Sequence, residues 1–434
     1  MLVKKLKINK YKSIRRSISL DFSDLNIFIG QNNCGKSNIL DAIEIIFNKE
    51  KDKSNLFYPE ADIELKLELD LEEINKYQTD KKINLVLKNQ KRSINSKNLL
   101  EILNQKVKRL DEKAFSDYKQ IRTDYNSLYN YPSKLNKFKE HLKLHFPKIV
   151  IDENAMDLKY ENEGLYEGKR RVTMDYLGSG FGRIFTILLY IFHPDYQVVM
   201  INEPETHLHP AIIKKLLWAM KNSQEGQIFF TTHSPLFITS STLHNVFRVS
   251  KEGKNTKVYS LGKEKYSHDR LVQELNSENL EMFFADKVIL VEGSSDLLLL
   301  RGLINQFYKG NKEVKIIQTY GKSNTSIYAD LLKIFKIPFL IILDRDVLKG
   351  YQIDELMRHL DIKLPSISGE KLIKELKKYN IFIFPNGDLE ANYPRKYQNE
   401  NSKSRNALLA VNLITDADFY SKQMKNLREI IELI

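Results

Sequence analysis

Residues Gly30–Ser37, which read GQNNCGKS, fit the pattern G-x-x-x-x-G-K-[ST] of a phosphate-binding loop. A short apolar run at 25–29 (LNIFI) precedes them, and apolar residues at helical spacing follow from Lys36, so the loop has its required strand-to-helix context. Gly30 and Gly35 let backbone N–H groups, including that of Asn33, approach a phosphate. Lys36 reaches the β- and γ-phosphates, and the Ser37 hydroxyl is a ligand for Mg²⁺. The sequence therefore predicts an ATP and Mg²⁺ site.

Three segments further along the chain fit the same site. The apolar run at 198–201 ends in Asn202-Glu203, where a strand delivers an acid toward the metal. The next apolar run, at 228–230, is followed by His233, which can contact a γ-phosphate. A glycine-rich turn at 178–182 opens a long apolar helix, and such a helix start can bind phosphate. Each segment is weak alone, but their order along the chain strengthens the prediction.

Composition sets the class of protein before any motif is considered. The 434 residues carry 68 Lys+Arg against 56 Asp+Glu, a net charge of +12, which suggests a polyanionic partner. Apolar residues make up 42% and charged residues 29%, which argues against wholesale disorder and predicts two to three globular domains. A single cysteine excludes an intramolecular disulfide and fits a reducing cytoplasm. No apolar run approaches the roughly 20 residues of a membrane span, so we expect a cytoplasmic protein without a membrane partner.

Residues 73–165 are rich in Lys, Asn and Tyr, and we expect them to form a helical insertion. Within them, 81–113 contains ten Lys/Arg against three Asp/Glu. One interpretation is a solvated helical face. The other is contact with a nucleic-acid backbone, with Lys106, Lys108 and Arg109 as candidate phosphate ligands.

The P-loop, the Gly-Ser-Gly turn, NEPETHLHP at 202–210 and TTHSP at 231–235 occur in this order. The set resembles the ATP-binding-cassette ATPases of the RecF/SMC type. That resemblance implies that Glu203 polarises the attacking water and that His233 is a switch histidine. It also implies that Ser179 and Gly180 close on the ATP of another subunit, so we expect a homodimer or larger assembly. Asn202 stands where the family has an aspartate, which puts fast hydrolysis in doubt.

A second group of acids follows the apolar strands predicted nearer the C-terminus. The run at 288–291 ends in Glu292, with Asp296 four residues on, and the run at 339–343 ends in Asp344-Arg345-Asp346. A third run, at 381–384, leads to Asp388 and Glu390. Because parallel strands present their carboxyl ends at one edge, these carboxylates would gather and repel one another. A divalent cation with oxygen ligands, Mg²⁺ or Mn²⁺, resolves that repulsion.

The pattern E-G-x-x-D followed by D-x-D resembles a Toprim domain, and an ABC-type ATPase followed by Toprim resembles the OLD (overcoming lysogenization defect) family of nucleases. That family includes the nuclease subunit of Gabija phage-defence systems and some retron effectors. The resemblance implies two-metal hydrolysis of DNA, a late basic residue for which Lys403 is the candidate, and a possible defence-system protein or nucleic-acid partner. The implied metal ligands are Glu292, Asp296, Asp344, Asp346 and Glu390.

The sequence therefore predicts an α/β protein with an ABC-type ATPase domain at 1–282 and a Toprim domain at 283–434. The expected function is ATP-regulated, metal-dependent DNA cleavage. Two alternatives stay open: an ATP-switched DNA-binding scaffold with an inactive Toprim domain, and topoisomerase-like strand passage. We also expect Cys34, between the P-loop glycines, to react readily, because a helix N-terminus and a neighbouring Lys lower a thiol's pKa.

Overall fold

The computed structural model describes residues 1–48, 61–69, 80–88, 91–93, 97–151, 165–167, 170–172, 178–223, 226–261, 279–363 and 366–434. The chain forms two compact units, Met1–Ser260 and Leu261–Ile434. The predicted boundary between 282 and 283 falls 22 residues inside the second unit, which begins at Leu261. Because η5 (Asn279–Phe283) hydrogen-bonds with elements of that unit, it belongs to the C-terminal side.

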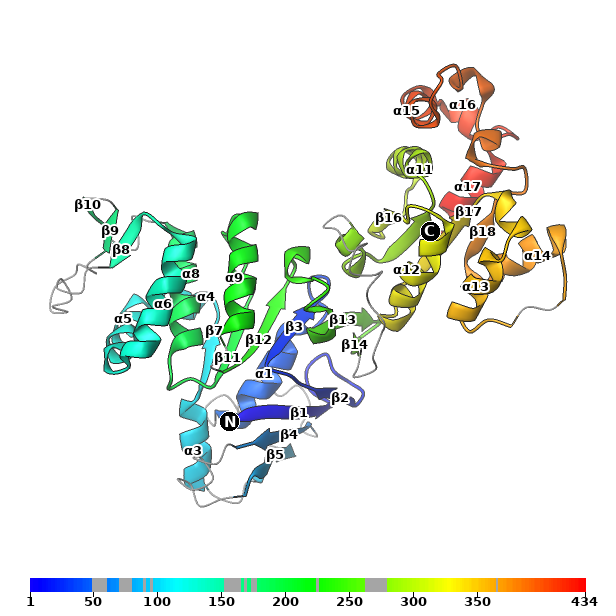
Figure 1. Cartoon of the computed structure of the whole chain (residues 1–434). Coiled ribbons are helices and arrows are strands. Elements are labelled where there is room, and N and C mark those ends of the chain that lie inside the picture. Colours follow the sequence, from blue (N-terminus) through cyan, green and yellow to red (C-terminus); the bar gives the residue numbers. More distant parts are fainter. Residues whose placement is uncertain are drawn as a thin grey trace. The chain divides into compact units, whose positions relative to one another are not determined.

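The first unit is built on a six-stranded sheet that contains the P-loop strand (Figure 1). Its strand order is β14-β13-β3-β12-β11-β7, and every neighbouring pair is parallel except β13 with β14. The strands are β3 (Leu25–Ile29), β7 (Val107–Leu110), β11 (Val198–Asn202), β12 (Gln227–Thr232), β13 (Val246–Glu252) and β14 (Asn255–Ser260). The central strands are buried along their whole length, which explains their continuous apolar runs.

Two smaller sheets complete the strands of this unit. An antiparallel sheet in the order β2-β1-β4-β5-β6 contains β1 (Leu2–Asn9), β2 (Ile18–Asp21), β4 (Asp62–Glu68), β5 (Lys82–Lys88) and β6 (Lys91–Ser93). In β4 the apolar residues alternate with polar ones and point into the core, as the sequence predicts for a strand with one wet face. A three-stranded sheet contains β8 (Ile149–Ile151), β9 (Leu165–Glu167) and β10 (Arg170–Val172).

The helices of the first unit confirm the helical periodicity read from the sequence. The P-loop is followed by α1 (Lys36–Phe47), the glycine-rich turn by α8 (Ser179–Phe192), and the NEPETHLHP segment by α9 (Pro210–Asn222). The remaining helices are α3 (Lys97–Gln105), α4 (Glu112–Phe115), α5 (Tyr118–Ser127) and α6 (Pro132–His145), with short 3₁₀ turns η2 (Leu128–Asn130), η3 (Pro235–Phe237) and η4 (Leu243–Asn245).

The prediction of a helical insertion over 73–165 is only partly right: α3, α4, α5 and α6 lie in it, but so do strands. Its strands β5 and β6 extend the antiparallel sheet, and β7 is the edge strand of the six-stranded sheet, pairing in parallel with β11. The sequence of β7, VKRL, is too short and too polar to announce a strand, because its stability comes from pairing with a distant segment. Parts of the predicted insertion, such as 152–164, lie outside the described residues.

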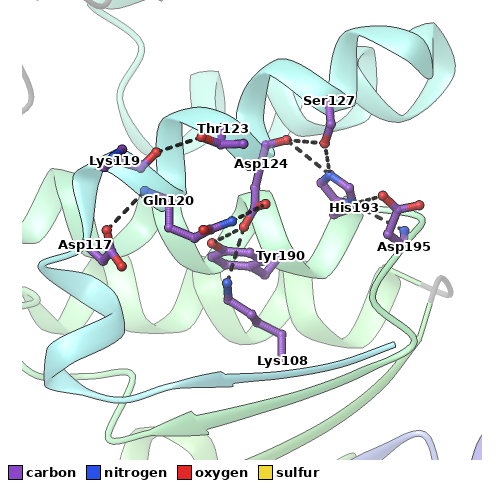
Figure 2. A network of polar contacts seen from close by, with 10 residues as sticks. All are labelled: Lys108, Asp117, Lys119, Gln120, Thr123, Asp124, Ser127, Tyr190, His193 and Asp195. Carbon is purple, nitrogen blue, oxygen red and sulfur yellow. Dashed lines mark hydrogen bonds and ion pairs between the residues drawn. The ribbon is translucent and has the colours of Figure 1, made fainter. Parts of the chain in front are cut away.

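The prediction that Lys108 and Arg109 bind a nucleic-acid backbone is also wrong. Both side chains are largely buried in ion pairs: Lys108 Nζ lies 3.3 Å from Asp124 Oδ2, and Arg109 Nη1 lies 2.7 Å from Asp41 Oδ1. Figure 2 shows Lys108 beneath Asp124, which also accepts a 2.5 Å hydrogen bond from Tyr190. These cations therefore join β7 to its neighbours. Residues 89–90 and 94–96 of the basic segment lie outside the described residues.

The second unit is a four-stranded parallel sheet in the order β16-β15-β17-β18, as predicted from the alternating pattern (Figure 1). Its strands are β15 (Lys287–Val291), β16 (Val314–Gln318), β17 (Phe339–Leu343) and β18 (Ile381–Ile383). Its helices are α11 (Ser294–Phe307), α12 (Lys322–Ile334), α13 (Gln352–His359), α14 (Gly369–Leu376), α15 (Lys403–Leu413), α16 (Asp416–Phe419) and α17 (Lys425–Glu432). Short 3₁₀ turns η6 (Arg345–Lys349), η7 (Lys377–Tyr379), η8 (Leu389–Asn392) and η9 (Arg395–Tyr397) fill the connections.

Within the described residues, every helix is either too short or too polar to cross a bilayer.

Candidate functional sites

The P-loop lies between β3 and α1, and its glycines are there for steric reasons. Gly30 has φ 144°, and a Cβ at this position would lie 2.1 Å from the carbonyl oxygen of Val249. Gly35 has φ 107°, and a Cβ would lie 2.4 Å from Thr256 Oγ1. Asn33 adopts a left-handed φ of 60°, which asparagine tolerates. The backbone of the loop is therefore packed from below and can turn its N–H groups toward a phosphate.

Lys36 is buried and folded back onto the loop that it belongs to. Its Nζ donates hydrogen bonds to the carbonyl oxygens of Gly30 and Gln31, both at 2.9 Å. Burial lowers the pKa of Lys36, while Glu203 and Glu205 act to raise it. The ammonium is held by carbonyl groups at the base of the cradle that the sequence predicts for phosphate. Ser37, in the first turn of α1, is exposed beside it.

The expectation of a reactive Cys34 is wrong. The side chain is 3% exposed and belongs to the apolar core beneath the loop. Burial raises the pKa of the thiol, and this effect outweighs the opposing charge of Lys36. The Cys34 carbonyl accepts a 2.7 Å hydrogen bond from Thr256 Oγ1, which fixes the loop against β14. Sequence position alone could not show that this residue faces inward.

Glu203 follows β11 in a strained turn that is held by surrounding groups. Its φ is 47°, in the left-handed region, and its side chain is half exposed. The backbone N–H of Glu203 donates to the carbonyl of Thr231 at 3.0 Å. Arg183 Nη2 donates to the carbonyl oxygens of Asn202 (3.1 Å) and Glu203 (2.8 Å). The carboxylate is therefore presented at the end of the sheet by a turn with little freedom to rotate.

Arg183 is a residue that the sequence analysis did not single out. It lies one turn into α8 and is 4% exposed. Its guanidinium stacks on the ring of Phe115 at 4.0 Å and pairs with Glu112 Oε1 at 3.1 Å. Its only sequence signal was an arginine inside an otherwise apolar helix. The structure thus links α8, whose first residues are Ser179 and Gly180, directly to the turn at Glu203.

His233 and Glu203 come together as predicted, with His233 Nε2 lying 3.5 Å from Glu203 Oε1. Burial and the nearby charge of Lys36 lower the pKa of His233, against the opposing effect of Glu203. Glu205 was not predicted as a site residue, yet its Oε1 accepts from the backbone N–H of His233 and from Thr232 Oγ1, both at 2.7 Å. Glu205 therefore orients the histidine loop, and burial raises its pKa.

Asn202, at the position where the family has an aspartate, lies against a cation. Its Oδ1 accepts from Arg109 Nη2 at 3.4 Å, while Arg109 Nη1 also pairs with Asp41 and with Glu44. The amide oxygen is thus oriented by a guanidinium whose charge two acids of α1 already balance. This geometry explains how an uncharged side chain is held there.

In the second unit, the predicted acids meet at one edge of the sheet. Glu292 follows β15 and Asp344 follows β17, and these strands are neighbours. Asp388 follows β18, which pairs with the other side of β17. The backbone N–H of Arg345 donates to the carbonyl of Gly387 at 2.8 Å, so the two loops are joined. Asp346 is exposed in η6, one residue beyond Arg345.

The electrostatics of this edge are unfavourable without a counter-charge. Burial, together with the carboxylates of Asp296, Glu292, Asp388 and Asp346, raises the pKa of Asp344 to about 7. Burial and the charges of Glu390 and Glu292 raise the pKa of Asp296 to about 6, although the Gly293 N–H donates to its Oδ2 at 2.9 Å. These shifts are those of carboxylates crowded in a partly dry site.

Lys403, at the start of α15, lies at the Asp388 side of this edge. Its Nζ is 3.0 Å from Asp388 Oδ2 and 3.0 Å from Glu390 Oε2. Burial acts to raise the pKa of Asp388, but the hydrogen bond from Lys403 outweighs it and lowers that pKa. Burial acts to lower the pKa of Lys403, and the two carboxylates outweigh it and raise that pKa. One ammonium therefore serves two acids, and Asp296 and Asp344 lie beyond it.

The group of carboxylates at this edge fits a divalent cation better than it fits the ammonium or guanidinium group of a protein side chain. All of its ligating atoms are carboxylate oxygens, and Glu390 Oε1 is buried without a hydrogen-bond partner among the described residues. Within the described part of the chain, no three His, Cys, Asp or Glu side chains stand in a ready-made coordination geometry. The carboxylates are thus gathered at one edge of the sheet.

Comparison with known proteins agrees with this division. Residues 25–239 match the family model described as "AAA domain, putative AbiEii toxin, Type IV TA system", and residues 283–346 match "Overcoming lysogenization defect protein-like, TOPRIM domain". The chain joins an AAA ATPase domain to an OLD-like TOPRIM domain. The acids Glu292, Asp296, Asp344 and Asp346 lie inside the matched TOPRIM residues, whereas Lys403 lies beyond them.

Three relatives are similar to this ATPase–TOPRIM chain. Endonuclease GajA of Bacillus cereus is 24% identical over 251 residues, which cover 48% of this chain and 37% of the relative. The OLD nuclease of Thermus scotoductus is 28% identical over 221 residues, covering 46% and 40%. An ATP/GTP phosphatase of Helicobacter pylori is 22% identical over 375 residues, covering 66% and 99%. The chain spans about two fifths of the length of the first two relatives.

Among solved structures, an SMC head bound to the C-terminal winged-helix domain of ScpA covers 61% of this chain and 98% of its own. Its TM-score is 0.46 and its sequence identity 14%.

Proposed function

We propose that the chain is an ATP-regulated, divalent-metal-dependent DNA endonuclease of the OLD type that acts in defence against phage. The observation that carries the proposal is the grouping of carboxylates from β15, β17 and β18 around one sheet edge, with Lys403 at their side. The relatives named endonuclease and OLD nuclease support it. The defence role rests on the family resemblance of the two-domain arrangement.

The proposed metal ligands are Glu292, Asp296, Asp344, Asp346 and Glu390. A bound Mg²⁺ or Mn²⁺ would supply Lewis-acid activation of water and charge stabilisation at the leaving oxygen. In the hydrolysis, water adds to the phosphorus, the bond to the leaving oxygen breaks, and that oxygen takes up a proton. Asp344, with a pKa of about 7 in the metal-free site, can carry a proton and release it when a cation arrives.

Lys403 has a separate proposed role beside the ligands. Its side chain is 61% exposed, and its ammonium is anchored by Asp388 and Glu390. From there it can interact with a phosphate oxygen that gains negative charge during hydrolysis. The two acids keep it protonated, because their charges raise its pKa.

The ATPase domain would control this cleavage. The phosphates and Mg²⁺ would be bound by the P-loop residues Gly30, Asn33, Gly35, Lys36 and Ser37. At the γ-phosphate, His233 would act together with Asn202 and Glu203. The start of α8, Ser179 and Gly180, would contact the nucleotide bound to a second copy of the chain. Arg183 joins the start of α8 to the carbonyls of Asn202 and Glu203. Pairing of two copies at α8 would therefore change the position of the Glu203 carboxylate.

The test is nicking of a supercoiled plasmid by the full chain with Mg²⁺ or Mn²⁺, with and without ATP. Asp344→Asn should abolish nicking and leave ATP binding unchanged, whereas Lys36→Ala should abolish ATP binding and change only the ATP dependence of nicking. If the wild-type chain leaves DNA intact under all these conditions but still binds it in an ATP-dependent way, the chain is a switched scaffold and the nuclease proposal fails.

A further inference from the structure

Tyr320 is an exposed aromatic residue in a strained backbone conformation. It directly follows β16 and is 57% exposed, while its φ of 54° lies in the left-handed region. For a residue with a Cβ this conformation costs roughly 1–2 kcal/mol. Among the described residues its ring has no hydrogen bond and no stacked aromatic partner. The ring therefore points outward in a conformation that destabilises the fold, and no stacking contact offsets that cost.

The backbone around Tyr320 is fixed from both sides by buried groups. Thr319 is fully buried; its N–H donates to the carbonyl of Val291 at 2.8 Å, and its hydroxyl lies 3.1 Å from that of Thr325. Asn324 Nδ2 donates to the carbonyl of Thr319 at 3.0 Å. Gly321 follows with φ 126°, a conformation that only glycine adopts readily. These contacts determine the direction of Tyr320, so its exposure is not the result of a loose loop.

The position of Tyr320 relative to the acids follows from strand register. In the pairing of β15 with β16, Val291 lies opposite Gln318, and the Thr319 N–H continues the ladder to Val291. Tyr320 and Glu292 therefore leave adjacent strands at the same edge of the sheet. Across the edge, the order is Tyr320, Glu292, Asp344 and then Asp388 with its partner Lys403.

We propose that Tyr320 stacks on the base of a nucleotide next to the scissile phosphate, and that the cleaved strand is single-stranded or locally opened at that point. The inference rests on the proposed nuclease function and adds the substrate form. Aromatic side chains bind bases through their faces without reading sequence. In an intact duplex those faces are covered by neighbouring base pairs, so a base must leave the stack to reach the ring.

The arrangement is also asymmetric across the site. The backbone phosphate lies over the carboxylates, one flanking base lies on the β16 side against Tyr320, and the other flank passes Lys403. The two ends of this row differ, since one is the aromatic Tyr320 and the other is the cationic Lys403. A strand laid in the opposite direction would place the base of the nucleotide on the other side of the cleaved bond against Tyr320.

The experiment uses oligothymidine strands of the full binding length with a single 2-aminopurine at each position in turn, and Ca²⁺ in place of Mg²⁺. Stacking on an aromatic ring quenches 2-aminopurine, so the wild-type chain should quench one position beside the cleavage point more than the others. Tyr320→Gly should remove this quench and weaken single-strand binding by about 5- to 100-fold, as expected for one stacked base. Tyr320→Phe should keep both.

Glycine is the informative substitution, because it accepts φ 54° without strain and should leave the fold at least as stable. Tyr420→Ala is the matched control: Tyr420 is a similarly exposed tyrosine of the same unit with an ordinary φ of −83°. Unchanged quenching and affinity in Tyr320→Gly would overturn the inference, as would an equal loss of affinity in Tyr420→Ala.

Failure of the nuclease proposal is seen separately. If the wild-type chain cleaves plasmid with Mg²⁺ while Tyr320→Gly binds single strands normally, only the stacking role is wrong. If the wild-type chain never cleaves, the nuclease function is wrong regardless of Tyr320.

Discussion

The two sites are built at the same place in similar sheets but in opposite electrostatic states. In the ATPase unit the two buried cations are already hydrogen-bonded: Lys36 donates to two carbonyls, and Arg183 pairs with Glu112 and donates to two further carbonyls. At the TOPRIM edge, burial and the neighbouring carboxylates raise the pKa values of Asp296 and Asp344, and Lys403 does not offset them. The comparison teaches that the first site is shaped before its ligand binds, while the second, under the proposed function, is completed by a divalent cation.

The sharpest test of the preshaped site is Gly35→Ala. The new Cβ would lie 2.4 Å from Thr256 Oγ1 and 2.7 Å from Ser13 Oγ, at φ 107°. We expect a loss of about 2–5 kcal/mol of stability from strain and overpacking. ATP affinity should fall by roughly 100-fold if the loop takes up about 3 kcal/mol of it. Calorimetry and ATP titration measure both.

Gly253→Ala is the control for that variant. Gly253 has φ 59°, but a Cβ there meets nothing within 4 Å. It should cost only about 1 kcal/mol and leave ATP binding intact. Equal effects of the two substitutions would show that backbone strain, and not steric contact with Thr256 and Ser13, accounts for the effect of Gly35→Ala.

Arg183→Met tests the link between α8 and the turn at Glu203. Removing the guanidinium leaves buried carbonyls of Asn202 and Glu203 with lost donors, which should cost about 2–4 kcal/mol. A displaced Glu203 should slow ATP hydrolysis up to about 100-fold in kcat with little change in ATP affinity. Glu112→Gln removes the partner that is 74% exposed and should change neither quantity by much. Hydrolysis unaffected by Arg183→Met would contradict a positioning role.

The crowded carboxylates at the TOPRIM edge predict that the stability of the metal-free chain decreases as pH rises. The pKa of Asp344 rises from 3.8 to about 7 on folding without metal, so the folded state binds more protons than the unfolded state between those values. The stability of the metal-free chain should therefore fall as pH rises from about 4 to 7. Asp344→Asn should reduce this fall, raise Tm at pH 8, and weaken the stabilisation by Mg²⁺.

Thermal melts at pH 5 and pH 8, with EDTA or with Mg²⁺, measure this effect. Asp354→Asn removes one exposed acid of the same unit, outside the carboxylate group, and should leave the pH dependence unchanged. If Asp344→Asn destabilises the metal-free chain at pH 8, repulsion among the carboxylates at this edge does not destabilise the fold.

The smallest expected effect concerns Cys34. Because its thiol is buried and its pKa is raised, we expect iodoacetamide to modify it slowly in the folded chain and quickly in urea. Added ATP should change the folded-state rate little, and Cys34→Ser should cost only about 1 kcal/mol. Mass spectrometry over time gives the rates. Rapid labelling of the native chain would show that the loop opens.

Much of both sites could be predicted from sequence, because each lies in a local motif between a strand and a helix. The P-loop, Glu203 and the acids after β15 and β17 were found in this way, and strand pairing confirmed that Glu292 and Asp344 leave neighbouring strands. The residues that hold these groups were not found. Arg183, Glu205 and Thr256 act through partners far along the chain, and no local pattern records such a contact.

The same reasoning explains the two wrong predictions in the insertion. A run of lysines and arginines shows charge but not which acids lie opposite in space. Lys108 is buried against Asp124 and Tyr190 (Figure 2). Arg109 is buried against Asp41, and both cations are placed by the pairing of β7 with β11, 91 residues downstream. Composition therefore described the segment's charge correctly and its surroundings incorrectly.

The bond from Thr256 to Cys34 has a consequence for synthesis on the ribosome. The P-loop strand β3 pairs with β12 and β13, and the loop itself is packed against Thr256, so its supports are translated more than 200 residues after it. Until then the apolar β3 emerges without its neighbours and is open to chaperones or to wrong pairing. A chain stalled before residue 256 would carry the complete GQNNCGKS motif and still lack a formed nucleotide cradle.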